Sequence, residues 1–457
     1  MDKATLSLLF LGIYFAVVLG VSWFVRTRKE AHDAGFAIGG RNVGFWATTG
    51  SLVSGNRDGG GLAVWVTIGA SLMFGFYWLI IGFAVALILH IIQLKYVRPL
   101  AEKHNFITQA DMIRSLIGPK TERGFSYVLI LFAIPYAALQ LYVSGQILSS
   151  LTGLSLVFGV GISAILVGIY LFWGGYQTLV VTDLLQWIIL AAILLLPYIL
   201  LQIPTDIPVI ENFLADGSFN FGIAGVGFLW GYCTPEIWQR MFSVKSVGVG
   251  RKSLIATILI FPVITIGLTL FGLYLAGIFP AMDSKELYYQ VFAQAPLPPL
   301  TLALAGITCI AITMSTLDTQ TYLFTSTVSK NIMKIDNVKD HDKYVRWNRI
   351  LMIGFLATLS LVAMGIYDLI KFMIDTALII SVFLPFIVYA LVFGNADRRC
   401  SDKQLSFALY GGAILYLGMF FGDSFTSLLH NLIPAAATSA FVILLHITMR
   451  GTESAKA

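Results

Sequence analysis

Charged residues are scarce in this sequence. Asp, Glu, Lys and Arg together make up 12% of its 457 residues, against roughly 25% in a typical soluble domain, whereas hydrophobic residues make up 58%. A soluble chain of this length would divide into two or three domains, yet no polar linker divides it, and apolar runs of about 20 residues recur along it. The sequence therefore predicts one membrane domain, 1–457.

Cysteine and histidine are also scarce, and neither forms a recognisable site. The three cysteines, Cys233, Cys309 and Cys400, lie far apart and match no zinc or redox spacing. The six histidines form no catalytic triad and no metal cluster. We expect no disulfide, no transition-metal site, no organic cofactor and no enzymatic activity.

Basic residues outnumber acidic ones and give a net charge of +5, but they do not gather on one stripe. They lie in short loops between apolar runs, which argues against a nucleic-acid partner and indicates a role in membrane topology. The apolar runs predict thirteen transmembrane helices, at 5–25, 43–67, 72–97, 123–150, 154–174, 178–202, 221–242, 250–278, 298–332, 345–366, 368–393, 404–421 and 431–449.

The loop charges test this count. With the N-terminus outside, the loop 202–219 lies outside and carries three acidic residues and neither Lys nor Arg. The thirteen helices then satisfy the positive-inside rule and predict a multi-pass protein of the cell (inner) membrane with a cytoplasmic C-terminus. The loops predicted inside contain Arg26, Arg28, Lys29 and Arg41; Lys95, Arg98 and Lys103; Arg240, Lys245, Arg251 and Lys252; Lys330, Lys334, Lys339, Lys343, Arg346 and Arg349; and Arg398, Arg399 and Lys403.

Two of the predicted helices, the second and the seventh, are interrupted. Segment 49–61 contains three successive glycines and places Arg57 and Asp58 near mid-membrane, and in the seventh helix Pro235 removes a backbone donor while Glu236 adds a charge. Irregular backbone at that depth survives only where protein or a water-filled cavity satisfies it. The two breaks lie five helices apart, in halves of opposite orientation, which is typical of a transporter's central site. The alternative is that the glycines only let helices pack closely.

Three segments make the chain resemble the sodium/solute symporter family, whose members include proline, sugar, sialic acid and iodide carriers. They are Gly174-Gly175 followed by Val181-Thr182-Asp183-Leu184-Leu185-Gln186; Pro235 through Gln239-Arg240-Met241-Phe242; and Ala311-Ile312-Thr313-Met314-Ser315-Thr316-Leu317-Asp318. The resemblance implies an all-α, leucine-transporter-type fold, a five-plus-five inverted repeat in which core helices 1 and 6 are the broken ones. It divides the chain into a preceding helix in 1–30, a first repeat in 42–202, a second repeat in 219–394 and two trailing helices in 401–450.

The ninth helix carries oxygen ligands on one face, because Ser315, Asp318 and Thr319 stand at i, i+3 and i+4. A hard cation such as Na⁺ prefers oxygen ligands. The resemblance implies a sodium site between carbonyl groups of core helix 1 and a carbonyl and two hydroxyls of core helix 8. Carried over to this chain, its ligands are Gly50, Val53, Ile312, Ser315 and Thr316. The alternative is that these hydroxyls only bond their own or a neighbouring helix.

The carboxylates of Asp183 and Asp318 should each have a partner, since an isolated carboxylate in the bilayer costs at least about 2.5 kcal/mol. Some family members hold a second sodium at the Asp of the Thr-Asp-x-x-Gln element. Our hypothesis is that Asp183, Ser315, Asp318 and Thr319 form a second cation site, or a proton site if Asp318 is protonated. In the alternative, Asp183 only anchors its own helix.

The resemblance places the solute beside the two breaks, which makes Ser54, Asn56, Arg57, Asp58, Gln140, Tyr142 and Glu236 the candidate substrate residues. Arg57 offers a fork of donors that fits a carboxylate, so it either clamps an acidic solute or pairs with an internal carboxylate. Acidic residues outnumber Arg57 at mid-membrane, and we therefore expect sodium to enter before the solute.

The predicted function is sodium-coupled symport of a small polar solute, bearing an amino or carboxylate group, by alternating access. The bilayer and the solute are the expected partners, with Na⁺ (or H⁺) as the coupling ion and no obligatory protein partner evident. Proton-coupled symport, passive facilitation and a transporter-like membrane sensor are the alternatives.

Overall fold

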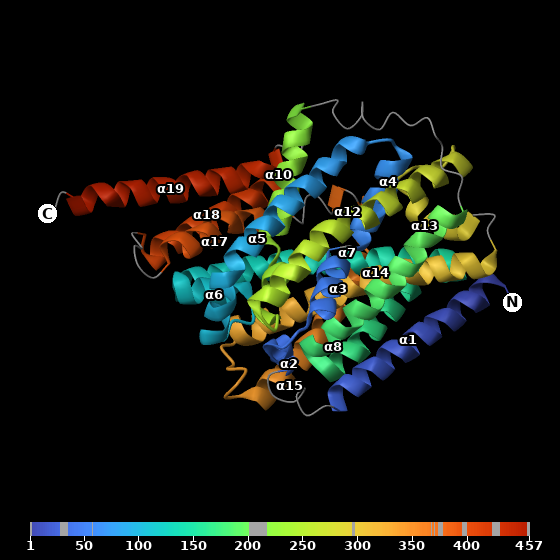
Figure 1. The fold of residues 1–457 in the computed structure, drawn as a ribbon, viewed down its shortest axis with the longest axis horizontal. Coiled ribbons are helices and arrows are strands. Elements are labelled where there is room, and N and C mark those ends of the chain that lie inside the picture. Colours follow the sequence, from blue (N-terminus) through green and yellow to red (C-terminus); the bar gives the residue numbers. More distant parts are fainter. Residues whose placement is uncertain are drawn as a thin grey trace.

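The computed structural model describes residues 2–27, 35–56, 58–200, 217–294, 298–366, 368–369, 371–372, 378–394, 400–422 and 430–454. In these ranges the regular secondary structure is helical, apart from one isolated β-bridge (Figure 1). Eight of the described helices are long and apolar enough to cross a membrane. The prediction of an all-α, multi-pass membrane protein is confirmed, whereas the count of thirteen spans stays a prediction.

The helices follow the predicted order. The first part contains α1 (Lys3–Thr27), α2 (Gly35–Ile38), α3 (Phe45–Gly55), α4 (Gly59–Ala70), α5 (Trp78–Lys103), α6 (Gln109–Leu116), α7 (Pro119–Thr152) and α8 (Leu156–Leu200). The second contains α10 (Gly217–Cys233), α11 (Pro235–Ser243), α12 (Val247–Ile278), α13 (Leu287–Gln294), α14 (Pro299–Ser326) with a π-helical extension at Thr327–Ile332, α15 (His341–Ala363), α17 (Leu384–Phe393), α18 (Asp402–Phe421) and α19 (Ile433–Ser454). Figure 1 shows α1 and α19 at opposite sides of the bundle.

Both predicted helix interruptions are present. The first separates α3 from α4, and there Asp58 caps α4 by accepting a hydrogen bond from the backbone N–H of Gly61. The second separates α10 from α11, where Thr234 is extended and Pro235 opens the new helix because its missing N–H is harmless at that position. The fold therefore has the broken core helices 1 and 6 that were predicted.

The two broken helices lie side by side. Val43, just before α3, and Val244, just after α11, form a parallel β-bridge. The backbone N–H of Val43 donates to the carbonyl of Ser243 over 3.3 Å, and the N–H of Lys245 donates to the carbonyl of Val43 over 2.9 Å. The beginning of core helix 1 is thus fastened to the end of core helix 6.

Pairs of glycines mark two close helix crossings. Where α4 crosses α12, a Cβ added at Gly69 or Gly272 would lie 1.9 or 2.0 Å from a carbonyl oxygen of the other helix. Where α5 crosses α10, the corresponding distances at Gly82 and Gly227 are 1.8 and 2.0 Å. Each crossing joins one half of a broken core helix to the continuous helix that follows the other break, so the glycines hold the two repeats in close contact.

Helix α8 contains the predicted boundary between two spans. Gly175 has a φ of +56° and a ψ of −143°, which breaks the helix and which only glycine adopts without strain. The ring of Phe36 fills the space that a side chain at this position would need. The bend brings Tyr170 and Asp183, about 20 Å apart along a straight helix, to neighbouring turns of α14.

Candidate cation and solute site

Asp183 of α8 is the centre of a buried hydrogen-bond cluster that joins four helices. Its Oδ1 accepts a bond from the hydroxyl of Ser315 on α14, and its Oδ2 accepts one from Ser51 on α3, each over 2.5 Å. The guanidinium of Arg240 on α11 completes the cluster, with its Nη2 3.2 Å from Asp183 Oδ2. Asp183, Ser51 and Ser315 are buried.

The same contacts align the predicted ligands of the first sodium site. Thr316 Oγ1 donates to the carbonyl oxygen of Gly55, at the end of α3, over 3.4 Å. With Ser51 and Ser315 both bonded to Asp183, this second link lays the last turns of α3 along the middle of α14. All five predicted ligands are buried: Gly50, Val53, Ile312, Ser315 and Thr316.

Arg240 was assigned from the sequence to a cytoplasmic loop, and that assignment is wrong. Its side chain is only 2% exposed. Its Nε donates to Ser51 over 2.8 Å, its Nη2 donates to Thr319 over 2.9 Å, and its guanidinium carbon lies 5.8 Å from the ring centre of Tyr176. The chain resumes a helix directly after the break at 234, and this helix, α11, is buried throughout. The count of charges expected at mid-membrane must therefore include Arg240 as a second positive group besides Arg57.

The four residues of the predicted second cation site divide into two groups. Asp183, Ser315 and Thr319 surround or adjoin the Arg240 guanidinium. Asp318 instead accepts a hydrogen bond from the hydroxyl of Tyr170 over 2.8 Å, and its other oxygen has no hydrogen-bond partner among the described residues. Both carboxylates are fully buried.

Around the first break, two side chains of α7 satisfy the irregular backbone and its cap. The carbonyl oxygen of the Gln140 side chain accepts a hydrogen bond from the backbone N–H of Gly59 over 2.7 Å. The hydroxyl of Tyr136 donates to the carboxylate of Asp58, which also caps α4. Asp58 and Gln140 are thus brought together as predicted candidates, while Arg57 lies outside the described residues.

Other candidate solute residues carry buried polar atoms that have no hydrogen-bond partner in the described part of the chain. These atoms are the hydroxyl of Ser54, the side-chain oxygen of Asn56 and one carboxylate oxygen of Glu236. The second carboxylate oxygen of Glu236 accepts a bond from Gln320 over 2.7 Å. Buried polar groups normally find partners, so these three atoms are suited to a ligand.

Tyr142 lies elsewhere. Its hydroxyl accepts a hydrogen bond from Gln146 over 3.0 Å, and Gln146 in turn accepts one from Tyr288 of α13. The structure therefore does not bring Tyr142 to the breaks. Two positions separate it from Gln140, which places the two side chains on different faces of α7.

The cluster contains residues that the sequence interpretation did not select. Ser51 and Arg240 both stand inside segments that had been singled out, so their polarity beside a helix break was an available signal. Tyr136, Tyr170 and Gln320 carry no such signal, because a Tyr or Gln in a membrane helix is equally suited to an interface or a neighbouring helix.

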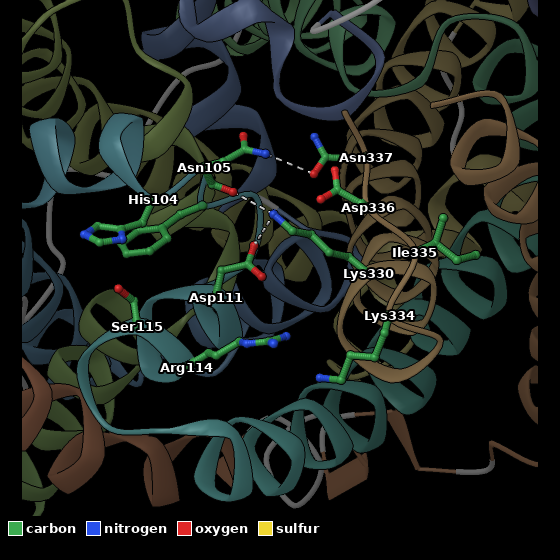
Figure 2. A pocket seen from close by; sticks show the side chains of 11 residues that line it. His104, Asn105, Asp111, Arg114, Ser115, Lys330, Lys334, Ile335, Asp336 and Asn337 are labelled. Atoms are coloured by element: carbon green, nitrogen blue, oxygen red, sulfur yellow. Dashed lines mark hydrogen bonds and ion pairs between the residues drawn. The ribbon is translucent and has the colours of Figure 1, made fainter. Parts of the chain in front are cut away.

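A separate polar cavity of about 640 Å³ lies between α6 and the end of α14, on the side predicted to be cytoplasmic (Figure 2). Lys330 is at its centre, bonded to the carbonyl of Asn105 over 2.6 Å and paired with Asp111 over 3.0 Å. Burial opposes ionisation of Asp111, but Lys330 and two backbone N–H groups outweigh it and lower its pKa. None of the predicted site residues lines this cavity.

Comparison with known proteins places these features in a family. The model of the sodium:solute symporter family matches residues 36–207. The sodium/proline symporter 2 of Staphylococcus saprophyticus subsp. saprophyticus is 25% identical over 398 residues, which cover 78% of this chain and 73% of that protein. A sodium/proline symporter of Staphylococcus aureus is 24% identical over 397 residues, with the same shares.

Solved structures with the same fold are transporters. A sodium-coupled sialic acid symporter in a substrate-bound, outward-open state has a TM-score of 0.80 at 16% identity and covers 97% of both chains. Mhp1, a nucleobase-cation-symport-1 family transporter in a closed conformation, has a TM-score of 0.52 at 12% identity, covering 93% of this chain and 96% of its own. These likenesses confirm the leucine-transporter-type fold.

Proposed function

Because this chain belongs to the sodium:solute symporter family, we propose that it is a sodium-coupled symporter that carries a small polar solute by alternating access. It is a multi-pass membrane transporter and not an enzyme. The observation that carries the proposal is the buried contact of the last turns of α3 with Ser315 and Thr316 of α14, through Asp183 and the Gly55 carbonyl.

The coupling ion is Na⁺, held by the carbonyl groups of Gly50, Val53 and Ile312 and the hydroxyls of Ser315 and Thr316. Carbonyls and hydroxyls replace the water of a hard cation without a full negative charge. Since the carbonyls of Gly50 and Val53 come from a broken helix and the other three ligands from a continuous one, an ion between them favours one arrangement of the two helices. That preference couples ion binding to alternating access.

The solute is a small molecule with an amino or carboxylate group, bound beside the two breaks. Ser54, Asn56 and Glu236 supply hydrogen bonds through the atoms that have no partner among the described residues, and the carboxylates of Asp58 and Glu236 suit an amine. The two staphylococcal relatives named above carry proline, and the sialic acid symporter among the structural neighbours carries sialic acid. Both of those solutes bear a carboxylate.

The finer arrangement follows the sequence. A preceding helix in 1–30 stands outside the repeats at 42–202 and 219–394, and two trailing helices lie in 401–450. The N-terminus faces outside and the C-terminus the cytoplasm of the cell (inner) membrane. A second cation or a proton at Asp183, Ser315, Asp318 and Thr319 is part of the same proposal.

Transport into proteoliposomes tests this function. Amino acids and small carboxylates, each radiolabelled, are offered under an inward sodium gradient, and in a parallel arm under an inward proton gradient. We expect one solute to accumulate above equilibrium with sodium and to leak out when a sodium ionophore is added. Accumulation driven only by protons would replace sodium by H⁺ as the coupling ion, and uptake that stops at equilibrium would make the protein a facilitator.

A pair of variants in α14 distinguishes the loss of the ion site from a loss of folding. Thr316→Val removes a predicted sodium ligand, whereas Thr321→Val removes an equally buried hydroxyl whose one bond within the described residues is to the carbonyl of Leu317 in its own helix. Sodium-driven accumulation should be lost in the first variant and retained in the second. Equal loss in both would count against the assigned ligands.

A further inference from the structure

The hydrogen-bonding groups at the two breaks narrow the choice of solute. Resting on the proposed sodium-coupled symport, we propose that the solute is a protonated amine, free or as part of an amino acid, and that the carboxylate of Glu236 binds its ammonium group. Carboxylic acids that lack an amino group are then not carried. Glu236 is the residue that makes this selection.

Helix α14 brings Glu236 close to the end of α3. The carbonyl of Gly55, in the last turn of α3, accepts a hydrogen bond from Thr316 over 3.4 Å. Gln320, one turn further along the same face of α14, donates to Glu236 over 2.7 Å. Since one helical turn rises by about 5.4 Å, the first turn of α11 and the end of α3 face neighbouring turns of α14.

Four side chains in this region each have an oxygen atom without a hydrogen-bond partner among the described residues. The atoms are Oγ of Ser54, Oδ1 of Asn56, Oε1 of Glu236 and Oε1 of Gln320, and the four residues are at most 7% exposed. The amide nitrogens of Asn56 and Gln320 are already engaged, one with a carbonyl of α3 and the other with Glu236. Because carboxylate and amide oxygens only accept, a ligand here must bring donors.

A protonated amine supplies what these atoms lack. It has up to three N–H donors, no acceptor and a positive charge. Its hydrogen bond to the Glu236 carboxylate is charge-assisted and therefore stronger than a bond between neutral groups. A carboxylate would bring only acceptors and a second negative charge, both of which are costly to bury without a partner.

The charges of the described residues at the breaks favour the same solute. The carboxylates of Asp58 and Glu236 lie close enough to repel each other, and Tyr136, whose hydroxyl bonds Asp58, interacts with both. Arg240 lies one turn beyond Glu236 on α11, but its Nε and Nη2 hold it in the Asp183 cluster. A cation bound beside Asp58 and Glu236 relieves their repulsion.

Matched probes test the amine requirement on the wild-type protein. Sodium-driven uptake into proteoliposomes is compared for proline and cyclopentanecarboxylate, for alanine and propionate, and for the amines pyrrolidine and ethylamine, each radiolabelled. We expect uptake of at least one amino-bearing probe, and no uptake of cyclopentanecarboxylate or propionate above that of empty liposomes. Sodium-driven uptake of either carboxylate would overturn the proposal and would favour Arg57 as a clamp for acidic solutes.

Binding of radioactive sodium to the purified protein separates this proposal from the proposed function. If the protein binds sodium but takes up none of the amino-bearing probes, the amine proposal is overturned and sodium coupling stands. If it binds no sodium, the proposed function is contradicted, and with it the amine proposal.

Variants test the role of Glu236. Glu236→Gln removes the charge and keeps the shape, and we expect uptake of the amino-bearing probe below saturation to fall at least about tenfold, the loss expected for one charge-assisted hydrogen bond, while sodium affinity stays within about twofold. Glu122→Gln is the matched control, because it neutralises another fully buried Glu, paired with Lys334 outside the site. It should retain uptake.

A third variant separates charge from shape. Glu236→Asp keeps the charge on a shorter side chain and should retain more uptake than Glu236→Gln. Equal loss in both variants, or wild-type uptake in Glu236→Gln, would overturn the role of the charge. The matched probes use the wild-type protein, so they decide the proposal even if a Glu236 variant does not fold.

Discussion

Alanine at Gly272 tests the crossing of the two repeats at α4 and α12. The new Cβ would lie 2.0 Å from the carbonyl oxygen of Val66, whereas ordinary contact begins at 3.4 Å, so the helices must separate by about 1.4 Å. Overpacking of this kind typically costs about 1–3 kcal/mol. Because alanine also favours the helix over glycine by about 1 kcal/mol, we expect a net loss of at most about 2 kcal/mol.

The assay is thermal unfolding of purified protein in detergent, with Gly277→Ala as the control in the same helix. An added Cβ at Gly277 meets no atom within 4 Å, so only the gain in helix propensity remains. Gly272→Ala should unfold at a lower temperature than the wild type, and Gly277→Ala at the same or a higher one. If both variants unfold alike, α4 and α12 do not approach each other as described.

Four further single variants and one double variant probe the buried charges. Asp183→Asn and Arg240→Gln should each cost about 3–5 kcal/mol of stability by stranding a charge, and the double variant should cost less than either in a chemical denaturation cycle; additive losses would contradict the pairing. Asp111→Asn should lower the free energy of unfolding at neutral pH, because Asp111 stabilises the fold only while it is ionised. The difference in free energy of unfolding between variant and wild type should be constant above about pH 4 and shrink as the pH falls through the lowered pKa of Asp111 in the folded state. A difference that grows in acid would refute this. Asp318→Asn should alter the cation or pH dependence of uptake, and unchanged dependence on both would remove Asp318 from any ion site.

The fold was largely accessible from the sequence because the bilayer limits the choices. Apolar run length and loop charge determine the order of spans, and Gly-rich or proline-containing interruptions such as 49–61 and Pro235 cannot stay helical at mid-membrane. The structure confirms both breaks. Helix length alone does not count a broken span such as α3 with α4, since each half is too short to cross the membrane.

The site was less accessible, and Arg240 shows why. Charge alone placed it in a cytoplasmic loop, because the positive-inside rule counts residues and does not see a helix that resumes beyond a break. Only the three-dimensional arrangement reveals that Asp183, thirteen residues from Tyr170, and Arg240 converge on one point of α14. Contacts of this kind depend on the bend at Gly175 and on side-chain direction, which spacing along the chain does not encode.

The central claim is that the end of α3 and the hydroxyl face of α14 enclose a sodium ion. The most direct measurement is the affinity for radioactive sodium of purified Thr316→Val beside Thr321→Val. The account predicts that Thr316→Val binds sodium at least about tenfold more weakly than the wild type, the loss expected for one ligand at about 1.4 kcal/mol, while Thr321→Val stays within about twofold. Wild-type affinity in Thr316→Val would contradict it.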